Sequence, residues 1–260
     1  MFRALHTAAT GMMAEQTHID VISQNMANVQ TTGYRRLHAE FRDLVYTEMR
    51  TPGTRTAQGQ VVPTGVMIGS GTRLAATEMS MTEGTLDQTG NPLDLAIEGN
   101  GFFQIRRPDG SLAYTRNGNF ALDPEGRLVT SDGMQVEPPI TVPQGVTAVN
   151  VGADGTVSVT MPTSGETQDV GRIELASFPN ATGLEPLGRN MYRATTASGP
   201  GLVAQPGNEG LGTLAQGMLE GSNVEVVTEM IDLISSQRAY ELNNRVVQAA
   251  DEMLQKATQG

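Results

Sequence analysis

The sequence of 260 residues contains no cysteine and no tryptophan, and aromatic residues make up only 4% of it. The absence of cysteine excludes disulfide bonds, thiolate catalysis and cysteine-ligated metals. Because bulky side chains are scarce, one large hydrophobic core is hard to build, and small or elongated layers are favoured. The length allows one to three domains.

Long apolar runs and an excess of basic residues are also missing. No stretch approaches the roughly 20 apolar residues that a membrane-spanning helix needs, and polar residues interrupt the N-terminus too often for a signal peptide. The net charge is −11, with 8 basic and 16 acidic residues in the segment 61–217. Nucleic-acid binding requires a basic surface and is therefore not predicted. These absences alone make the cytoplasm the default compartment.

Catalytic and metal-binding motifs are absent as well. The histidines His6, His18 and His38 form no HExxH pattern, so no metal site is predicted. The segment 69–71 starts like a dinucleotide loop but lacks its third glycine. Asp87, Asp94 and Glu98 are candidate carboxylates for glycan hydrolysis, although acids at turns are more often simply solvated. We therefore predict no catalytic residue, no cofactor and no small-molecule substrate.

Residues 3–29 are predicted to form a helix, because apolar residues recur there with helical spacing. Its apolar row at intervals of seven consists of Leu5, Met12, Ile19 and Met26. Gly11 lies inside this helix at a cost of about 1 kcal/mol relative to alanine. With small neighbours it marks either a close helix contact or a tolerated defect. Gly33 is predicted to close the helix in the left-handed conformation.

Residues 222–258 are predicted to form a second helix, roughly 55 Å long, with Ser222 or Asn223 as its N-cap. Its apolar row at intervals of seven consists of Val226, Leu233, Tyr240, Val247 and Leu254. Five such positions are typical of a helix with a coiled-coil partner. The partner is either the first helix, in a simple intramolecular hairpin, or helices of other copies.

Residues 85–205 are predicted to form a β-rich outer domain, since turn-forming dipeptides alternate there with short β-prone runs. These dipeptides are Asn100-Gly101, Asp109-Gly110, Asn117-Gly118, Asp132-Gly133 and Asp154-Gly155. Residues 31–84 and 206–217 are predicted to be an intermediate connecting segment of irregular and β structure. The predicted fold is α+β and discontinuous, with residues 1–30 and 218–260 as a terminal coiled-coil domain.

Three segments resemble signatures of the bacterial flagellar rod and hook protein family, in the order typical of that family. They lie within residues 23–34, 93–118 and 222–241, so the resemblance covers nearly the whole chain. The signature residues are Asn25, Asn28, Thr32, Gly33, Tyr34, Gly99, Gly101, Phe102, Phe103, Asn223, Gln237, Arg238, Ala239 and Tyr240. Residues 46–63 resemble a loop of members that form the distal rod, with Tyr46, Arg50, Pro52, Arg55 and Pro63 as its characteristic residues.

The resemblance implies a structural subunit that polymerises into a rigid rod and transmits torque from motor to hook. The two apolar rows are then its self-assembly surfaces, in an inner helical layer. Implied partners are further copies, proximal rod proteins, the hook protein, ring proteins at the peptidoglycan and outer membrane, and the flagellar export apparatus. Export through that apparatus without a cleaved signal implies a periplasm-spanning rod.

Three alternatives remain open. The chain can be a proximal rod or hook-type member of the same family. It can be an enzyme that acts on cell-wall glycans, which requires a cleft with paired carboxylates of shifted pKa. It can also be a soluble β-rich binding module with a helical tail.

Overall fold

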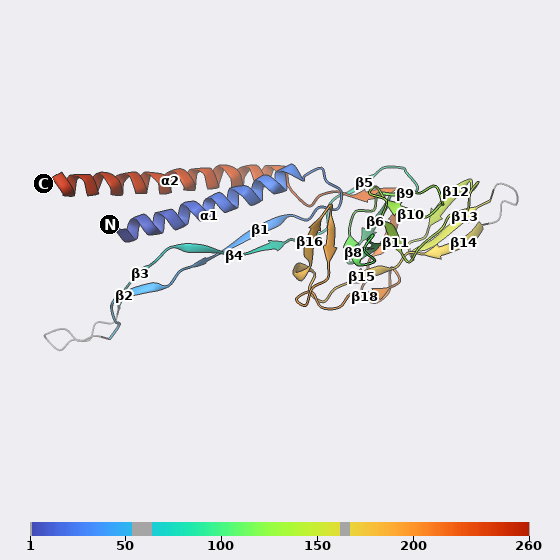
Figure 1. The fold of residues 1–260 in the computed structure, drawn as a ribbon, viewed down its shortest axis with the longest axis horizontal. Coiled ribbons are helices and arrows are strands. Elements are labelled where there is room, and N and C mark those ends of the chain that lie inside the picture. The colour runs from blue at the N-terminus through green and yellow to red at the C-terminus, as the bar shows by residue number, and fades with distance from the viewer. Residues whose placement is uncertain (1, 54–63, 162–166, 260) are drawn as a thin grey trace. The chain divides into compact units, whose positions relative to one another are not determined.

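The computed structural model describes residues 2–53, 64–161 and 167–259, and its helices and strands make this an α+β protein (Figure 1). The chain divides into two compact units. Unit 1 comprises residues 1–27, 37–78 and 225–260, and unit 2 comprises residues 28–36 and 79–224. No helix of the described residues is long and apolar enough to cross a membrane.

Two long helices dominate unit 1, where they run side by side (Figure 1). Helix α1 spans Phe2–Ala27 and helix α2 spans Val226–Gln259. Both predicted helices are confirmed, with ends that differ by one to four residues from the expected ones. Gly33 does adopt a left-handed conformation (φ +68°), but it lies six residues beyond the end of α1 instead of closing it.

The predicted N-cap of α2 is wrong. Asn223 lies three residues before the first residue of the helix, and its side chain forms hydrogen bonds within unit 2. Its Oδ1 accepts from the Arg36 backbone N–H (2.6 Å), and its Nδ2 donates to the carbonyl oxygens of Ser80 (3.1 Å) and Thr82 (2.9 Å). The Ser222 hydroxyl accepts from the Val224 N–H, which also precedes the helix. These two side chains therefore shape the chain entering α2.

Unit 1 also contains two strand pairs. Strand β1 (Leu37–Asp43) pairs with β4 (Thr72–Met79), and β2 (Tyr46–Arg50) pairs antiparallel with β3 (Val66–Gly69). The β2–β3 pair is a hairpin whose connection includes residues 54–63, and these lie outside the described residues. Arg55 and Pro63 of the predicted loop belong to that stretch.

Unit 2 is built of short strands. Nine of them form one sheet in the order β16-β17-β8-β7-β11-β10-β9, with β15 pairing to β7 and β18. A second sheet has the order β12-β13-β14, and β6 pairs with β19 and β5 with β20. The elements are β5 (Leu86–Gln88), β6 (Leu95–Glu98), β7 (Phe102–Arg106), β8 (Leu112–Thr115), β9 (Phe120–Leu122), β10 (Leu128–Thr130), β11 (Gln135–Glu137), β12 (Ala148–Val151), β13 (Thr156–Thr160), β14 (Thr167–Arg172), β15 (Leu175–Ser177), η1 (Ala181–Gly183), β16 (Glu185–Gly188), β17 (Met191–Arg193), β18 (Leu202–Ala204), β19 (Thr213–Gln216) and β20 (Met218–Glu220).

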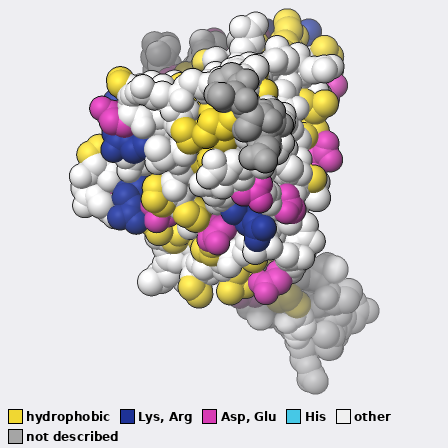
Figure 2. All heavy atoms as spheres, turned by 90° about the vertical axis from the view of Figure 1, so that its right-hand side faces the viewer, with side chains coloured by type: hydrophobic (Ala, Val, Ile, Leu, Met, Phe, Trp, Pro, Cys, Tyr) yellow, Lys and Arg dark blue, Asp and Glu magenta, His cyan; other side chains and the backbone are white. Residues whose placement is uncertain are grey.

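The core of unit 2 consists of aliphatic side chains and two phenylalanines. Phe103 and Ile105 of β7 point into it, because successive side chains of a strand alternate between its two faces. The ring of Phe103 meets that of Phe120 edge to face, with centroids 5.1 Å apart. The other core residues are Leu95, Ile97, Leu128, Val136, Ile140, Val157, Ile173, Leu175, Leu211 and Leu214. One end of the unit shows basic and acidic side chains interspersed, with no broad patch of one kind (Figure 2).

Three of the predicted turn dipeptides join neighbouring antiparallel strands. Asp109-Gly110 lies between β7 and β8, Asp132-Gly133 between β10 and β11, and Asp154-Gly155 between β12 and β13. The glycines have φ of +81°, +78° and +84°, which glycine adopts without steric cost. Asn117-Gly118 has a different role, because a Cβ on Gly118 would lie 1.6 Å from the Leu95 carbonyl oxygen.

Candidate assembly interface

On α2, the side chains that are buried are small or polar. Along α2, Glu229, Ser236 and Ala250 are buried, and Asn243 is half-buried. Because these four are seven residues apart, they share one face of the helix. The face of α2 turned to α1 therefore differs from the predicted apolar row, which runs beside it.

Two polar contacts join the helices. Asn25 and Glu229 are 1% and 0% exposed, and Asn25 Nδ2 donates to a Glu229 carboxylate oxygen (3.3 Å). The same amide also pairs with the backbone of Leu37 in β1, through its nitrogen and its oxygen, each at 2.9 Å. His18 Nδ1 lies 2.9 Å from the Ser236 hydroxyl. Buried polar pairs such as these can fix the register in which two helices meet.

Gly11 marks a close helix contact. A Cβ built on this residue would lie 2.9 Å from Asn243 Nδ2, closer than side-chain atoms normally approach. Of the two roles that the sequence allowed for Gly11, the packing role is therefore confirmed. Small and polar residues therefore bring the helices together at these positions of α2, while α1 also buries Val21 and Ile22.

The predicted apolar rows are incompletely covered within one chain. Val226 and Tyr240 are exposed. The remaining members are half-buried: Leu5, Met12, Ile19, Met26, Leu233, Val247 and Leu254. The structure thus places these residues at the margin of the helix contact and not at its centre. Their role in self-assembly stays a prediction.

The first turns of α2 expose further large apolar side chains that the seven-residue row did not include. Val227 is 64% exposed, Ile231 62% and Ile234 50%. Met230 lies among them and is also exposed. A signal for them exists in the sequence, because apolar residues occupy several sides of this helix, as is typical of a helix surrounded by protein.

The β2–β3 hairpin is apolar and exposed too. Tyr46, Met49, Met67 and Ile68 are exposed, and Val45, the residue before β2, is 83% exposed. Of the predicted loop residues, Arg50 donates from Nη2 to the Thr64 carbonyl oxygen (3.4 Å), and Pro52 is exposed. A two-stranded hairpin with uncovered apolar side chains gains stability when another surface covers it.

Family-signature residues of unit 2 surround a buried ion cluster that the sequence did not reveal. The Glu220 carboxylate lies 2.7 Å from Arg35 Nη2 and 3.3 Å from Arg116 Nη1. Burial lowers the pKa of Arg116 to about 10, although the nearby Glu220 carboxylate acts in the opposite direction and raises it. Arg116 therefore remains charged at neutral pH.

Backbone carbonyls and a glycine complete this cluster. Arg35 Nη1 donates to the Thr82 carbonyl (2.7 Å), and Arg116 Nη2 donates to the carbonyl of signature residue Gly99 (2.6 Å). The backbone N–H of Gly33 donates to the Glu220 carbonyl (2.8 Å). A Cβ on Gly33 would lie 2.8 Å from the backbone carbon of Arg116. The cluster therefore ties residues 33–35 to the β structure of unit 2.

The other signature residues lie in both units. Tyr34, Phe102 and Phe103 are buried in unit 2, where Gly101 (φ +139°) packs against Leu211 and Leu175. In the same unit, Asn28 Oδ1 accepts from Thr31, and the Thr32 carbonyl accepts from Asn190 Nδ2. Gln237 and Arg238 are exposed on α2, and Ala239 is half-buried.

Of the three carboxylates weighed for catalysis, Asp94 has structural partners. Asp94 is buried and accepts from the Thr89 hydroxyl (2.6 Å) and the Asn91 amide (3.0 Å), whereas Asp87 and Glu98 are exposed. Within the described residues, no three histidine or acidic side chains are grouped to hold a metal ion.

Three family models match the chain. The flagella basal body rod protein model matches residues 5–35, the flagellar hook protein FlgE/F/G D1 domain matches residues 96–159, and the flagellar basal body rod FlgEFG protein C-terminal model matches residues 215–260. The first begins in α1, the second falls within unit 2, and the third extends from β19 through α2.

Whole-chain relatives agree with these matches. The flagellar basal-body rod protein FlgG of Caulobacter vibrioides is 44% identical over 99% of this chain and 98% of its own length. The FlgG protein of Bacillus subtilis is 38% identical over 98% of each chain. The flagellar basal-body rod protein FlgF of Caulobacter vibrioides is 33% identical over the whole of this chain and 98% of its own.

Proposed function

This chain belongs to the flagellar basal-body rod protein family, and on that premise we propose that it is a structural subunit that polymerises into the distal rod and transmits torque from motor to hook. The observation that carries the proposal is the uncovered apolar surface on the first turns of α2. Surface of this kind on a soluble subunit is typical of a protein contact. Identical subunits with head-to-tail contacts that do not close build a helical filament.

We propose that α1 and α2 form the inner layer of the rod as a coiled-coil pair, with the β structure of unit 2 outside it. Within one chain, many large apolar side chains of α2 stay exposed and are left for neighbouring subunits. Such a division supports assembly, because the intramolecular contact sets the register of the pair and the intermolecular contacts supply most of the buried apolar area. The three-part division of the chain expected from the sequence stays a prediction for the polymer.

We also propose that the β2–β3 hairpin stiffens the rod by contacting a neighbouring subunit. Its exposed apolar side chains support this role, and Arg50 provides a charge that can reach acidic surfaces. A contact that bridges subunits would oppose the sliding that lets a polymer bend.

The rod would lie in the basal body and span the periplasm after export through the flagellar apparatus. Its neighbours there would be the proximal rod proteins, the hook protein and the ring proteins around the shaft. These components are proposed from the family, and we propose no cofactor and no catalytic activity for the chain.

A proximal rod or hook-type protein is the alternative within the family. Two relatives from the same organism bear on it, because Caulobacter vibrioides FlgG is 44% identical to this chain and FlgF is 33% identical. The higher identity to FlgG favours the distal rod assignment.

The proposal is tested by placing a charge on the exposed apolar surface of α2. We expect Ile234→Asp to raise the concentration needed for polymerisation at least tenfold, because an unpaired charge in a dry contact costs several kcal/mol. Ser235→Asp is the matched control, since Ser235 is also exposed and adjacent in sequence. Sedimentation of the pure chain at increasing concentration measures the effect.

The monomer should keep its thermal midpoint in both variants, because Ile234 is half exposed already. Polymerisation of Ile234→Asp at the wild-type concentration would show that this surface faces solvent in the rod. A collapsed midpoint would instead show that the side chain packs within its own chain.

A further inference from the structure

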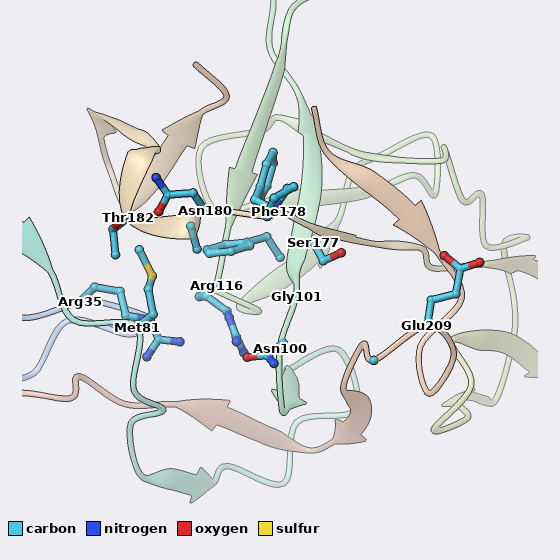
Figure 3. A pocket seen from close by; sticks show the side chains of 14 residues that line it. Arg35, Met81, Asn100, Gly101, Arg116, Ser177, Phe178, Asn180, Thr182 and Glu209 are labelled. Atoms are coloured by element: carbon cyan, nitrogen blue, oxygen red, sulfur yellow. Dashed lines mark hydrogen bonds between the residues drawn. The ribbon is translucent and has the colours of Figure 1, made fainter. Parts of the chain in front are cut away.

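A cavity of about 380 Å³ in unit 2 has two arginines in its wall. Figure 3 shows the Arg35 and Arg116 side chains converging there, with the Asn100 side chain beside Arg116. Arg116 also lies 5.5 Å above the ring of Phe102, which fixes its orientation. Glu209 lines the cavity too, but its carboxylate points away from the arginines in the figure.

The positive charge in this wall is incompletely balanced. Arg35 and Arg116 are 2% and 3% exposed, and they share one buried carboxylate, that of Glu220. The Nε atoms of both arginines are buried without a hydrogen-bond partner. Glu83 also attracts Arg116, but Glu83 is exposed. Its attraction affects the pKa of Arg116 less than the repulsion by Arg35 does. Buried charge without full compensation is costly, so a further anion at this wall would be stabilised.

We propose that this cavity binds the carboxylate of an acidic side chain from a second copy of the chain. Arginine pairs match carboxylates well, because each planar guanidinium can donate two parallel hydrogen bonds. The Asn100 amide adds a neutral donor at the same wall. A second copy is a plentiful source of such a group, since each chain carries 28 acidic residues and a net charge of −11. The choice of a second copy rests on the proposed function.

Supplying a carboxylate from within the chain tests this proposal. Asn100→Asp is nearly isosteric and places the charge beside Arg116. We expect a higher thermal midpoint for the monomer, because the excess positive charge is neutralised. We also expect the concentration needed for polymerisation to rise about tenfold, because the added carboxylate repels the one from the neighbour. Asn150→Asp adds the same charge at an exposed position in β12, away from the cavity, and should change neither quantity.

A free carboxylate separates the two possible sources of the ligand. Sodium acetate should raise the thermal midpoint of the wild-type monomer relative to sodium chloride at equal ionic strength, and should do so less in Asn100→Asp. An equal effect of chloride and acetate would overturn a carboxylate site. A selective acetate effect combined with normal polymerisation of Asn100→Asp would assign the site to a free carboxylate and overturn the role of the second copy.

Failure here can be told from failure of the proposed function. If the wild-type chain forms no polymer at any concentration, the rod proposal fails, while the acetate measurement on the monomer still reports on the cavity. If the wild type polymerises and Asn100→Asp does so equally well, only the contribution of the neighbouring copy is overturned. A lower midpoint for Asn100→Asp would contradict the charge argument itself.

Discussion

At the scale of single residues, the decisive contacts join positions that are far apart in the chain. Glu220 meets Arg35 and Arg116, and the Gly33 backbone lies against that of Arg116. The left-handed conformation of Gly33 could be predicted from the sequence, because threonines and a glycine follow a helical pattern. Its close approach to Arg116 could not, since spacing in sequence carries no information on a contact between such distant positions.

Gly33 gives a test of this close packing. We expect Gly33→Ala to lower the free energy of unfolding by about 2–3 kcal/mol, because the methyl group meets backbone atoms in addition to the strain of a positive φ. Gly133→Ala is the matched control, since Gly133 has φ +78° and open space around it. That variant should cost only about 1 kcal/mol.

Urea denaturation followed by circular dichroism measures both glycine variants. Equal losses of stability would mean that the backbone strain alone matters and that the contact with Arg116 is easily relieved.

At the scale of elements, both helices and several hairpin turns follow from local sequence patterns. Helical spacing predicts α1 and α2, and Asp-Gly dipeptides predict three turns of unit 2. The apolar pattern did not predict the face of α2 that meets α1, because Glu229, Ser236 and Asn243 on that face are polar. The start of α2 was missed because the Asn223 side chain bonds to distant backbone groups instead of capping the helix.

The β2–β3 hairpin offers a test at this scale. The backbone N–H of Leu44 donates to the Gly71 carbonyl (2.8 Å), so the chain ends flanking the hairpin meet. Removing residues 46–69 should therefore leave β1 and β4 joined by a short turn. We expect this deletion variant to polymerise into rods of shorter persistence length, because contacts that bridge subunits are lost. Electron micrographs measure the curvature, and rods as straight as the wild type would contradict a stiffening role.

At the scale of the whole molecule, most of the exposed large apolar side chains of the described residues lie in unit 1, on α2 and around the β2–β3 hairpin, although unit 2 also exposes Leu202 and Val203 of β18. Unit 2 has its own core, and one end of it shows interspersed charges (Figure 2). Under the proposed function, most of the apolar subunit contacts would therefore be made by unit 1. We therefore expect α1 and α2 to have little stability in the monomer, because many large apolar side chains of α2 stay exposed there.

Hydrogen exchange of the backbone amides, compared between the dilute monomer and the polymer, tests this account most directly. We predict that amides of α1 and α2 exchange rapidly in the monomer and become strongly protected in the polymer, since subunit contacts cover their apolar side chains. Amides in the core strands of unit 2 should be protected equally in both. Strong protection of α1 and α2 in a proven monomer, or a small species of fixed size at every concentration, would contradict the account.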